Sequence, residues 1–336
     1  MSNTSPGYGI TIRVDGRAEF QPVAEITTII SREGATITAL DVAESSLDSV
    51  VIDVTCDAMD SNHAEKITAA LAASPILKVR KVSDRTFLIH LGGKLEVQSK
   101  VPLKTRDDLS RAYTPGVARI CQAIAKDPAD ARRLTIKRNT VAVVTDGSAV
   151  LGLGNLGPAA ALPVMEGKAA LFKRFADVDA WPVCLDTQNV DEIVRTVQLL
   201  APVYGGINLE DIKAPECFEI EKRLKEELRI PIMHDDQHGT AIVVLAALIN
   251  SLKLVNKQIE NCKIIINGVG AAGTAIAHLL VLRGAINIIG FDRKGAITKK
   301  RESNDEMRQW FMDTCNPSQF EGTLSEAMND ADIFIG

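Results

Sequence analysis

The stretch from residue 262 to residue 292 restricts the fold more than any other part of the chain. An apolar segment, CKIIING, leads into a glycine-rich turn, which is followed by a segment with helical spacing and by a second apolar segment, INIIGFD, ending in Asp292. The residues of the turn are Gly268, Gly270, Ala271, Ala272 and Gly273. Gly268 and Asp292 are 24 residues apart. This order predicts a Rossmann βαβ unit in which backbone amides approach a pyrophosphate.

The acid that ends this unit bears on the choice of dinucleotide. A carboxylate at this position hydrogen-bonds the ribose 2′-hydroxyl and repels a 2′-phosphate, so Asp292 favours NAD. Arg293 and Lys294 follow it directly and could soften that preference, which leaves NADP possible.

A second G-x-G-x-x-G pattern occurs earlier, in VLGLGNLGP (150–158). Pro158 and Pro163 are expected to interrupt the helix that should follow, and the next strand ends near Asp186, too late for a compact βαβ unit. We therefore interpret this loop as the wall of a site and not as the loop that holds the nucleotide. Its residues for this role are Gly152, Gly154, Asn155 and Gly157.

Composition bounds the class of protein. The 336 residues, 46% hydrophobic and 24% charged, allow two or three globular domains. The net charge of −5 and the absence of a basic tract argue against a nucleic-acid partner. The first residues have no apolar core of a secretion signal, and the longest apolar run, at 241–249, is too short to span a membrane. Six scattered cysteines favour reduced thiols and a cytoplasmic location.

Three domains are predicted, all of α/β class. Residues 1–90 have the order β-α-β-β-α-β of a ferredoxin-like sandwich, with Ser61 as the start of the second helix. Residues 91–258 open with a polar linker up to residue 116 and then alternate helical and β-rich segments, which predicts a largely parallel sheet covered by helices. Residues 259–336 hold the Rossmann unit.

Acidic pairs follow two of the apolar strands in the middle domain. Glu210 and Asp211 come after GGINL, and Asp235 and Asp236 come after PIMH. Because carboxylates gathered at neighbouring strand ends repel one another, a hard divalent cation such as Mg²⁺ or Mn²⁺ is the economical explanation. Solvated acids that cap helices are the alternative. Lys168 lies on an otherwise apolar helix, where a lysine near carboxylates could act as a base.

Six motifs in order carry a resemblance to a known family. They are AYTPGV, TDGSAVLGLGNLGP, PVMEGKA, INLEDI, MHDDQHGTA and NGVGAAGTA. From about residue 95 onward the chain resembles the malic enzymes, in their shorter bacterial form. The resemblance implies oxidative decarboxylation of L-malate to pyruvate and CO₂ with NAD(P) and a divalent metal. It also implies a homodimer.

The resemblance also assigns roles to residues. It implies that Lys168 is the general base that takes the C2 hydroxyl proton and that Tyr113 is the general acid that protonates C3 of enolpyruvate. It implies that Asp235 orients Lys168. The metal ligands that it implies are Glu210, Asp211 and Asp236.

The chain departs from the family pattern in two places. Ala149 stands where eukaryotic members carry an arginine that grips malate, so the contact to the malate carboxylate comes from elsewhere. The sequence ends at DADIFIG, about halfway through a Rossmann domain, so we expect an incomplete nucleotide domain and a truncated chain.

The N-terminal unit resembles the ACT domains, a family of small-molecule-sensing modules. Gly34, between its first helix and second strand, sits where that family commonly places its ligand loop. A packing or dimerisation domain without an effector is the alternative.

Two other functions compete with malate oxidation. One is a regulatory small-molecule-binding protein with an inactive catalytic body, although none of the five site residues is missing. The other is an amino-acid dehydrogenase, which pairs similar domains but works without a metal, so its activity would survive EDTA.

Overall fold

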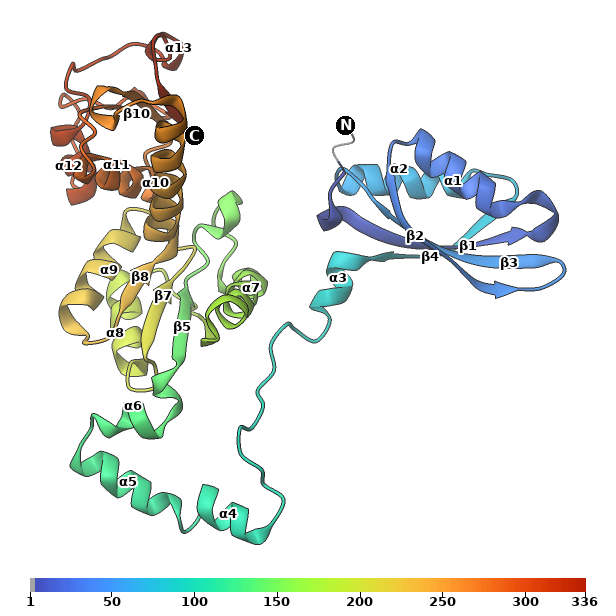
Figure 1. Cartoon of the computed structure of the whole chain (residues 1–336), viewed down its shortest axis with the longest axis horizontal. Helices are drawn as coiled ribbons and strands as arrows, with labels where there is room; N and C mark the ends of the chain where they lie inside the picture. The colour runs from blue at the N-terminus through green and yellow to red at the C-terminus, as the bar shows by residue number, and fades with distance from the viewer. Residues whose placement is uncertain (1–3) are drawn as a thin grey trace. The chain divides into compact units, whose positions relative to one another are not determined.

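The computed structural model describes residues 4–336, which divide into two compact units at Lys94/Leu95. Unit 1 is a four-stranded antiparallel sheet of order β2-β3-β1-β4 with helices α1 and α2 packed on it and a short helix after the last strand (Figure 1). Its elements are β1 (Gly9–Arg17), α1 (Pro22–Arg32), β2 (Thr36–Ser45), β3 (Ser49–Asp57), α2 (Ser61–Ala72), β4 (Leu77–Asp84) and a final short helix, α3 (Arg85–His90). The element order β-α-β-β-α-β is as predicted.

One buried cluster holds unit 1 together. Ile12, Val14, Ile52 and Val54 alternate along β1 and β3 and point to the face on which α1 and α2 pack. The cap of α2 differs from the prediction. Asp60, not Ser61, is the N-cap, because its carboxylate accepts a hydrogen bond from the backbone N–H of His63.

Unit 2 begins with three helices, and the first of them lies within the segment that was predicted as linker. They are α4 (Arg106–Ala112), α5 (Val117–Lys126) and α6 (Asp130–Leu134). Thr105 and Asp108 form a capping box at the start of α4, so the linker assignment for residues up to 116 was wrong there. The pattern T-x-x-D was the available signal.

A parallel sheet of order β6-β5-β7-β8 follows in unit 2. Its strands and helices are β5 (Thr140–Thr145), α7 (Pro158–Ala176), β6 (Asp179–Cys184), α8 (Val190–Leu200), β7 (Gly206–Leu209), α9 (Glu216–Glu227), β8 (Ile232–His234) and α10 (Asp235–Val255). The chain leaves β5 for β6 on one side and later returns to β7 on the other. The carboxyl ends of β5 and β7 therefore form a topological switch point, where α/β sheets bind ligands.

α7 corrects one expectation from the sequence. The helix is continuous from Pro158 to Ala176, so Pro158 and Pro163 do not interrupt it. Pro158 occupies the first helical turn, where its missing N–H costs nothing. β5, α7 and β6 consequently do form a βαβ unit, contrary to the argument made from Asp186, but with a long loop between β5 and α7.

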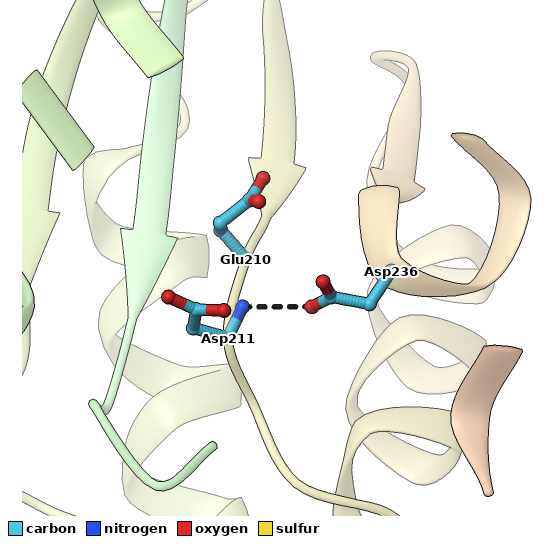
Figure 2. A group of neighbouring side chains, drawn as sticks. All are labelled: Glu210, Asp211 and Asp236. Carbon is cyan, nitrogen blue, oxygen red and sulfur yellow. Dashed lines mark hydrogen bonds between the residues drawn. The ribbon is translucent and has the colours of Figure 1, made fainter. Parts of the chain in front are cut away.

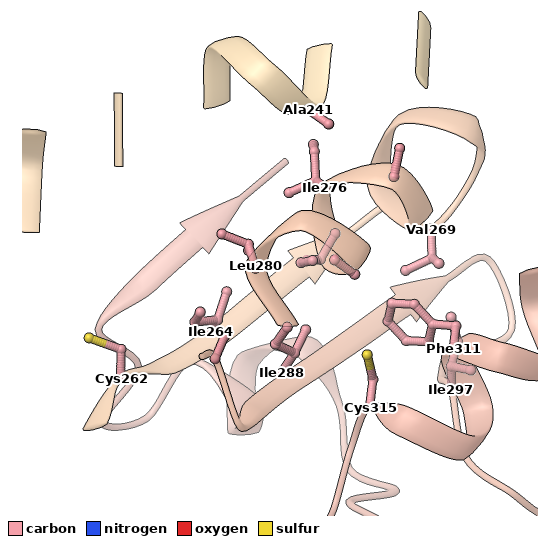
Figure 3. Close-up of a cluster of buried hydrophobic side chains, with 14 of the residues drawn as sticks. Ala241, Cys262, Ile264, Val269, Ile276, Leu280, Ile288, Ile297, Phe311 and Cys315 are labelled. Atoms are coloured by element: carbon pink, nitrogen blue, oxygen red, sulfur yellow. The ribbon is translucent and has the colours of Figure 1, made fainter. Parts of the chain in front are cut away.

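The last sheet has the order β11-β10-β9-β12, with β9, β10 and β12 parallel. Its elements are β9 (Lys263–Asn267), α11 (Ala271–Leu282), β10 (Asn287–Asp292), β11 (Gly295–Ala296), α12 (Glu306–Thr314), α13 (Leu324–Ala327) and β12 (Ile333–Ile335). Figure 3 shows the core between this sheet and its helices, in which Ile264, Leu280 and Phe311 are fully buried and Ala241 of α10 joins them.

α10 links the two sheets of unit 2. By length and composition alone, this helix is long and apolar enough to cross a membrane, because it extends well beyond the apolar run at 241–249. Its first turn carries Asp235 and Asp236, and Val244, Leu245 and Leu248 pack on the core around α11. These contacts are those of a helix between two domains.

Candidate active site

Three carboxylates meet at the carboxyl end of the parallel sheet. Glu210 and Asp211 follow β7 directly, and Asp236 lies in the first turn of α10, which begins at the end of β8. One oxygen from each lies within 4.8 Å of the others (Figure 2). The backbone N–H of Asp211 donates to Oδ2 of Asp236 over 2.8 Å, which ties the two strand ends together.

The cluster has the donors that a hard divalent cation requires. Glu210 and Asp211 are buried, and Oδ2 of Asp211 has no hydrogen-bond partner among the described residues. A buried, unpaired carboxylate oxygen is costly. Together the three carboxylates offer the all-oxygen ligand set that suits Mg²⁺ or Mn²⁺, so these residues fit the predicted ion.

The protonation of these acids reflects their crowding. Burial raises the pKa of Glu210 to about 7, although the charge of Lys168 and a hydrogen bond from Asn208 act in the opposite direction. Burial and the neighbouring charge of Asp236 raise the pKa of Asp211 to about 6. Both carboxyl groups are thus destabilised as anions until a cation or lysine offsets them.

Lys168 of α7 reaches into this cluster. Its Nζ donates to Oδ2 of Asp235 over 2.6 Å and lies 3.1 Å from Oε1 of Glu210. Burial lowers the pKa of Lys168, but the hydrogen bond to Asp235 and the charge of Glu210 outweigh it, and the pKa lies above its ordinary value. The structure therefore brings together Lys168, Asp235 and all three predicted metal ligands.

Tyr113 lies elsewhere. It follows α4 and is 67% exposed, and α4 and α5 precede α6 and the amino end of β5, whereas the carboxylates lie at the carboxyl ends of the strands (Figure 1). Within one chain the structure does not bring Tyr113 to Lys168.

The first glycine loop lies against the carboxylate cluster. The backbone N–H of Leu151 donates to Oδ1 of Asp211 over 3.4 Å, and that of Ala149 donates to the Asp211 carbonyl over 2.9 Å. Gly152, Gly154 and Gly157 all have positive φ, a backbone conformation that favours glycine. Asn155 accepts a hydrogen bond from Gln188.

The second glycine loop has the packing that the dinucleotide fingerprint requires. A Cβ at Gly273 would lie 2.2 Å from the carbonyl oxygen of Gly268, so only glycine lets α11 approach β9. Cβ atoms at Gly268 and Gly270 would meet open space, on the side where a pyrophosphate would approach. Ala271 and Ala272 form the first turn of α11.

Asp292 ends β10 as predicted, but two arginines already hold its carboxylate. Arg301 donates from Nη1 to both carboxylate oxygens at 2.9 Å, and Arg308 pairs with Oδ2. Burial raises the pKa of Asp292, but these guanidinium groups lower it further, so the net pKa is below its ordinary value. Arg293 and Lys294, the basic residues considered from sequence, are exposed.

Two of the residues that the sequence analysis missed support the site. Asn208 is buried and donates from Nδ2 to Oε2 of Glu210 over 2.9 Å. Asn208 lies on β7 two residues before Glu210, and a spacing of two in extended chain places side chains on one side, which was the available signal. Arg308 comes from α12 and had no local signal.

His234 and His238 do not converge on a common point. His234 is fully buried before α10, and Nε2 of His238 pairs with Glu221 of α9. Glu221 also accepts a hydrogen bond from the backbone N–H of His234.

The fold and site define a class: an α/β dinucleotide-dependent oxidoreductase with a carboxylate cluster at a sheet switch point. Comparison with known proteins identifies the family within this class. Residues 92–225 match the malic enzyme N-terminal domain, and residues 237–335 match the malic enzyme NAD binding domain. The chain belongs to the malic enzyme family.

Individual relatives agree with this. The NAD-dependent malic enzyme of Geobacillus stearothermophilus is 54% identical over 97% of this chain, which covers 68% of that protein. The NADP-dependent malic enzyme of Rhizobium meliloti is 52% identical over 73% of this chain and 32% of its own length. The crystal structure of NAD-dependent malic enzyme from Thermotoga maritima matches with a TM-score of 0.73 at 48% identity, over 76% of this chain and 68% of that one.

Proposed function

We propose that the protein oxidatively decarboxylates malate to pyruvate and CO₂ and reduces NAD(P). The observation that carries this proposal is the position of Lys168, whose Nζ lies 3.1 Å from Oε1 of Glu210. Glu210 belongs to a cluster of three carboxylates in which one oxygen of each lies within 4.8 Å of the others. Relatives named as NAD-dependent and NADP-dependent malic enzymes support the same activity.

The metal ligands in this proposal are Glu210, Asp211 and Asp236. When bound, a divalent ion would polarise the C2 oxygen of malate, and NAD(P) would accept the hydride. Asn208 holds the Glu210 carboxylate in place through its 2.9 Å hydrogen bond.

Lys168 serves as the general base in this proposal. Its Nζ would accept the proton of the C2 hydroxyl, and Asp235, 2.6 Å away, keeps Nζ aimed at the cluster. Asp235 is therefore a positioning residue. Tyr113 donates the proton that C3 receives after CO₂ departs, a role that rests on the family resemblance.

The dinucleotide in this proposal lies on the second glycine loop, with its pyrophosphate at the N-terminus of α11. Asp292 favours NAD because it accepts a hydrogen bond from a ribose 2′-hydroxyl. Gly152, Gly154, Asn155 and Gly157 would face malate or the nicotinamide from the opposite wall, and the bonds from this loop to Asp211 support that position.

The test is an assay of the full-length protein with malate, NAD⁺ and Mn²⁺. We expect NADH and pyruvate in equal amounts, loss of both on addition of EDTA, and recovery with excess Mn²⁺. Amino-acid oxidation that survives EDTA would instead support the metal-independent dehydrogenase, and no turnover of either substrate would support the inactive body.

For unit 1 we propose an ACT-like sensor of a small-molecule effector in a cytoplasmic enzyme. Gly34 supports this proposal, because it turns the chain between α1 and β2 with φ of +83° and open space where a Cβ would be. A thermal-shift screen of amino acids and central metabolites tests it. A rise in melting temperature that Gly34→Val abolishes would support a sensor, and no shift with any compound would favour a packing role.

A further inference from the structure

One buried acid of unit 2 has no role in the site described so far. Glu221 of α9 is 6% exposed, and the other acids that are buried among the described residues are Asp146, Glu210 and Asp211. Glu221 does not belong to the carboxylate cluster, whose third member is Asp236. Burying a carboxylate is costly unless polar or charged partners surround it. The partners of Glu221 therefore indicate what this acid does.

Glu221 joins α9 to the start of α10 at two points. Its Oε1 accepts a hydrogen bond from the backbone N–H of His234 over 3.1 Å. Nε2 of His238 lies 2.8 Å from Oε1 and 2.9 Å from Oε2. Since α10 begins at Asp235, these contacts hold the residue before the helix and the last residue of its first turn.

Lys225 offsets the charge of Glu221. It lies one turn further along α9, and its Nζ is 2.8 Å from Oε1 of Glu221. Burial raises the pKa of Glu221, but the hydrogen bonds from His238 and Lys225 lower it further, so the net pKa is below its ordinary value. Glu221 is therefore an anion at the N-terminus of α10, where the helix dipole favours negative charge.

The start of α10 lacks a side-chain cap of its own. His234 is the N-cap residue, and its side chain makes no capping hydrogen bond. In a capping box, the third residue of the helix accepts from the backbone N–H of the N-cap. That residue here is Gln237, which instead directs Nε2 to Sγ of Cys217 over 3.8 Å. Glu221, from another helix, supplies the missing acceptor.

The turn that Glu221 holds carries two residues of the proposed site. Asp235 accepts the hydrogen bond from Lys168, and Asp236 belongs to the carboxylate cluster. Neither carboxylate is fixed by deep burial, since the side chain of Asp235 is 29% exposed and that of Asp236 is 39% exposed. Their directions therefore depend on the backbone of this first turn.

We infer that Glu221 is a positioning residue for the proposed reaction: it fixes the first turn of α10 and so aims the carboxylates of Asp235 and Asp236. Glu221 acts through the backbone of His234 and the ring of His238, and it supplies no ligand to the metal. This inference rests on the proposed roles of Asp235 and Asp236.

The test is Mn²⁺ binding to the full-length, metal-free protein, measured by electron paramagnetic resonance without substrate. Glu221→Gln keeps the size of the side chain and removes its charge. We expect the dissociation constant for Mn²⁺ to rise roughly 10- to 100-fold, as when other residues that support a metal ligand are lost. Glu219→Gln makes the same change at an exposed position of α9, and this control should bind Mn²⁺ as the wild type does.

Turnover of malate gives a second readout. When Mn²⁺ is saturating, kcat of Glu221→Gln should stay at least about tenfold below the wild-type value, because Asp235 moves together with Asp236. KM for NAD⁺ should not change, since the proposed dinucleotide loop lies on α11. Recovery of full kcat at saturating Mn²⁺ would contradict the claim that Glu221 also aims Asp235.

His238→Ala tests the same path from the other helix. It removes one of the two ties and should weaken Mn²⁺ binding, whereas the double variant with Glu221→Gln should bind no more weakly than Glu221→Gln alone. Such non-additivity is expected of side chains that act as one unit. If Glu221→Gln does not fold, His238→Ala decides the matter, because wild-type Mn²⁺ affinity in this variant would overturn the inference.

Other outcomes separate the inference from the proposed function. A Glu221→Gln protein with a lower melting temperature but wild-type Mn²⁺ affinity would mean that Glu221 only stabilises the fold. Losses that add up in the double variant would mean that Glu221 and His238 act independently. A wild-type protein that binds no Mn²⁺ would contradict the proposed metal site, and the inference would fail with it.

Discussion

Asp235 is the residue that would position Lys168 if this lysine is the general base, as proposed. Its carboxylate accepts a 2.6 Å hydrogen bond from Lys168 Nζ and contributes to the raised pKa of that lysine. A lysine held in this way has a fixed direction but retains its proton to higher pH. Asp235 therefore affects both the direction in which Lys168 Nζ points and the pKa of Lys168.

Asp235→Asn should reduce kcat by roughly 10- to 100-fold, the usual cost of losing a supporting partner. Because the substitution also removes a negative charge, the acidic limb of the pH–rate profile should move to lower pH. Asp177→Asn, which alters a surface ion pair on the same helix, is the control. An unchanged pH profile in Asp235→Asn would contradict the positioning role.

In the proposed site, Asp292 and its two arginines lie where they would affect the choice between NAD and NADP. Asp292→Ala should free Arg301 and Arg308 to bind a 2′-phosphate, since guanidinium groups recognise phosphate well. We expect the ratio of kcat/KM for NADP⁺ over NAD⁺ to rise at least tenfold. Glu302→Ala, an exposed neighbour, should leave the ratio unchanged, and the same constancy in Asp292→Ala would show that these arginines do not reach the cofactor.

Among the elements, the junction of β9 and α11 has no room for a side chain at Gly273. Gly273→Ala should lower the free energy of unfolding by about 1–3 kcal/mol, because the new methyl group would overlap the Gly268 carbonyl 2.2 Å away. Gly270→Ala is the matched control, since its Cβ meets open space. Urea unfolding of both variants measures the difference, and equal stabilities would contradict the close helix–strand contact.

The raised pKa values of the two acids that follow β7, Glu210 and Asp211, predict that metal binding depends on pH. The pKa of Glu210 is raised to about 7 and that of Asp211 to about 6, so both bind protons that a metal must displace at lower pH. In the metal-free protein these groups stabilise the fold below about pH 4 and lose that contribution as the pH rises through 6 to 7.

Mn²⁺ should therefore raise the melting temperature more at pH 7.5 than at pH 5.5. Its dissociation constant should increase at least about tenfold between these values, because one or two protons compete. Calorimetric titration in two buffers of different ionisation enthalpy would count those protons. Binding that is independent of pH would mean that the metal ligands are already ionised.

Sequence patterns predicted these elements to different degrees. The strand, turn, helix and acid at residues 262–292 form a local unit with strong rules, and the structure has it as predicted. The start of α7 was predicted wrongly because Pro158 and Pro163 were taken as helix breakers, although Pro158 fits the first turn and the helix continues through Pro163. The helix α4 was missed because a capping box is a weaker signal than periodicity.

At the scale of the whole molecule, long-range pairing limits what sequence can reveal. The acidic pairs were predicted to meet because parallel strands end at one edge of a sheet. No local rule places Arg308 of α12 on Asp292, sixteen residues away across a loop, and no rule places Tyr113 at the other end of the sheet from Lys168. Contacts and separations of this kind depend on how the helices and sheets pack in three dimensions.

The most direct test of the account is a count of Mn²⁺ bound to the full-length protein by electron paramagnetic resonance. The account predicts one tightly bound ion per chain, and at least about a tenfold weaker affinity in Glu210→Gln and Asp236→Asn, since each removes a charged ligand. Glu216→Gln, an acid outside the cluster, should bind as the wild type does. Wild-type affinity in Glu210→Gln and Asp236→Asn would contradict the claim that these carboxylates hold the metal.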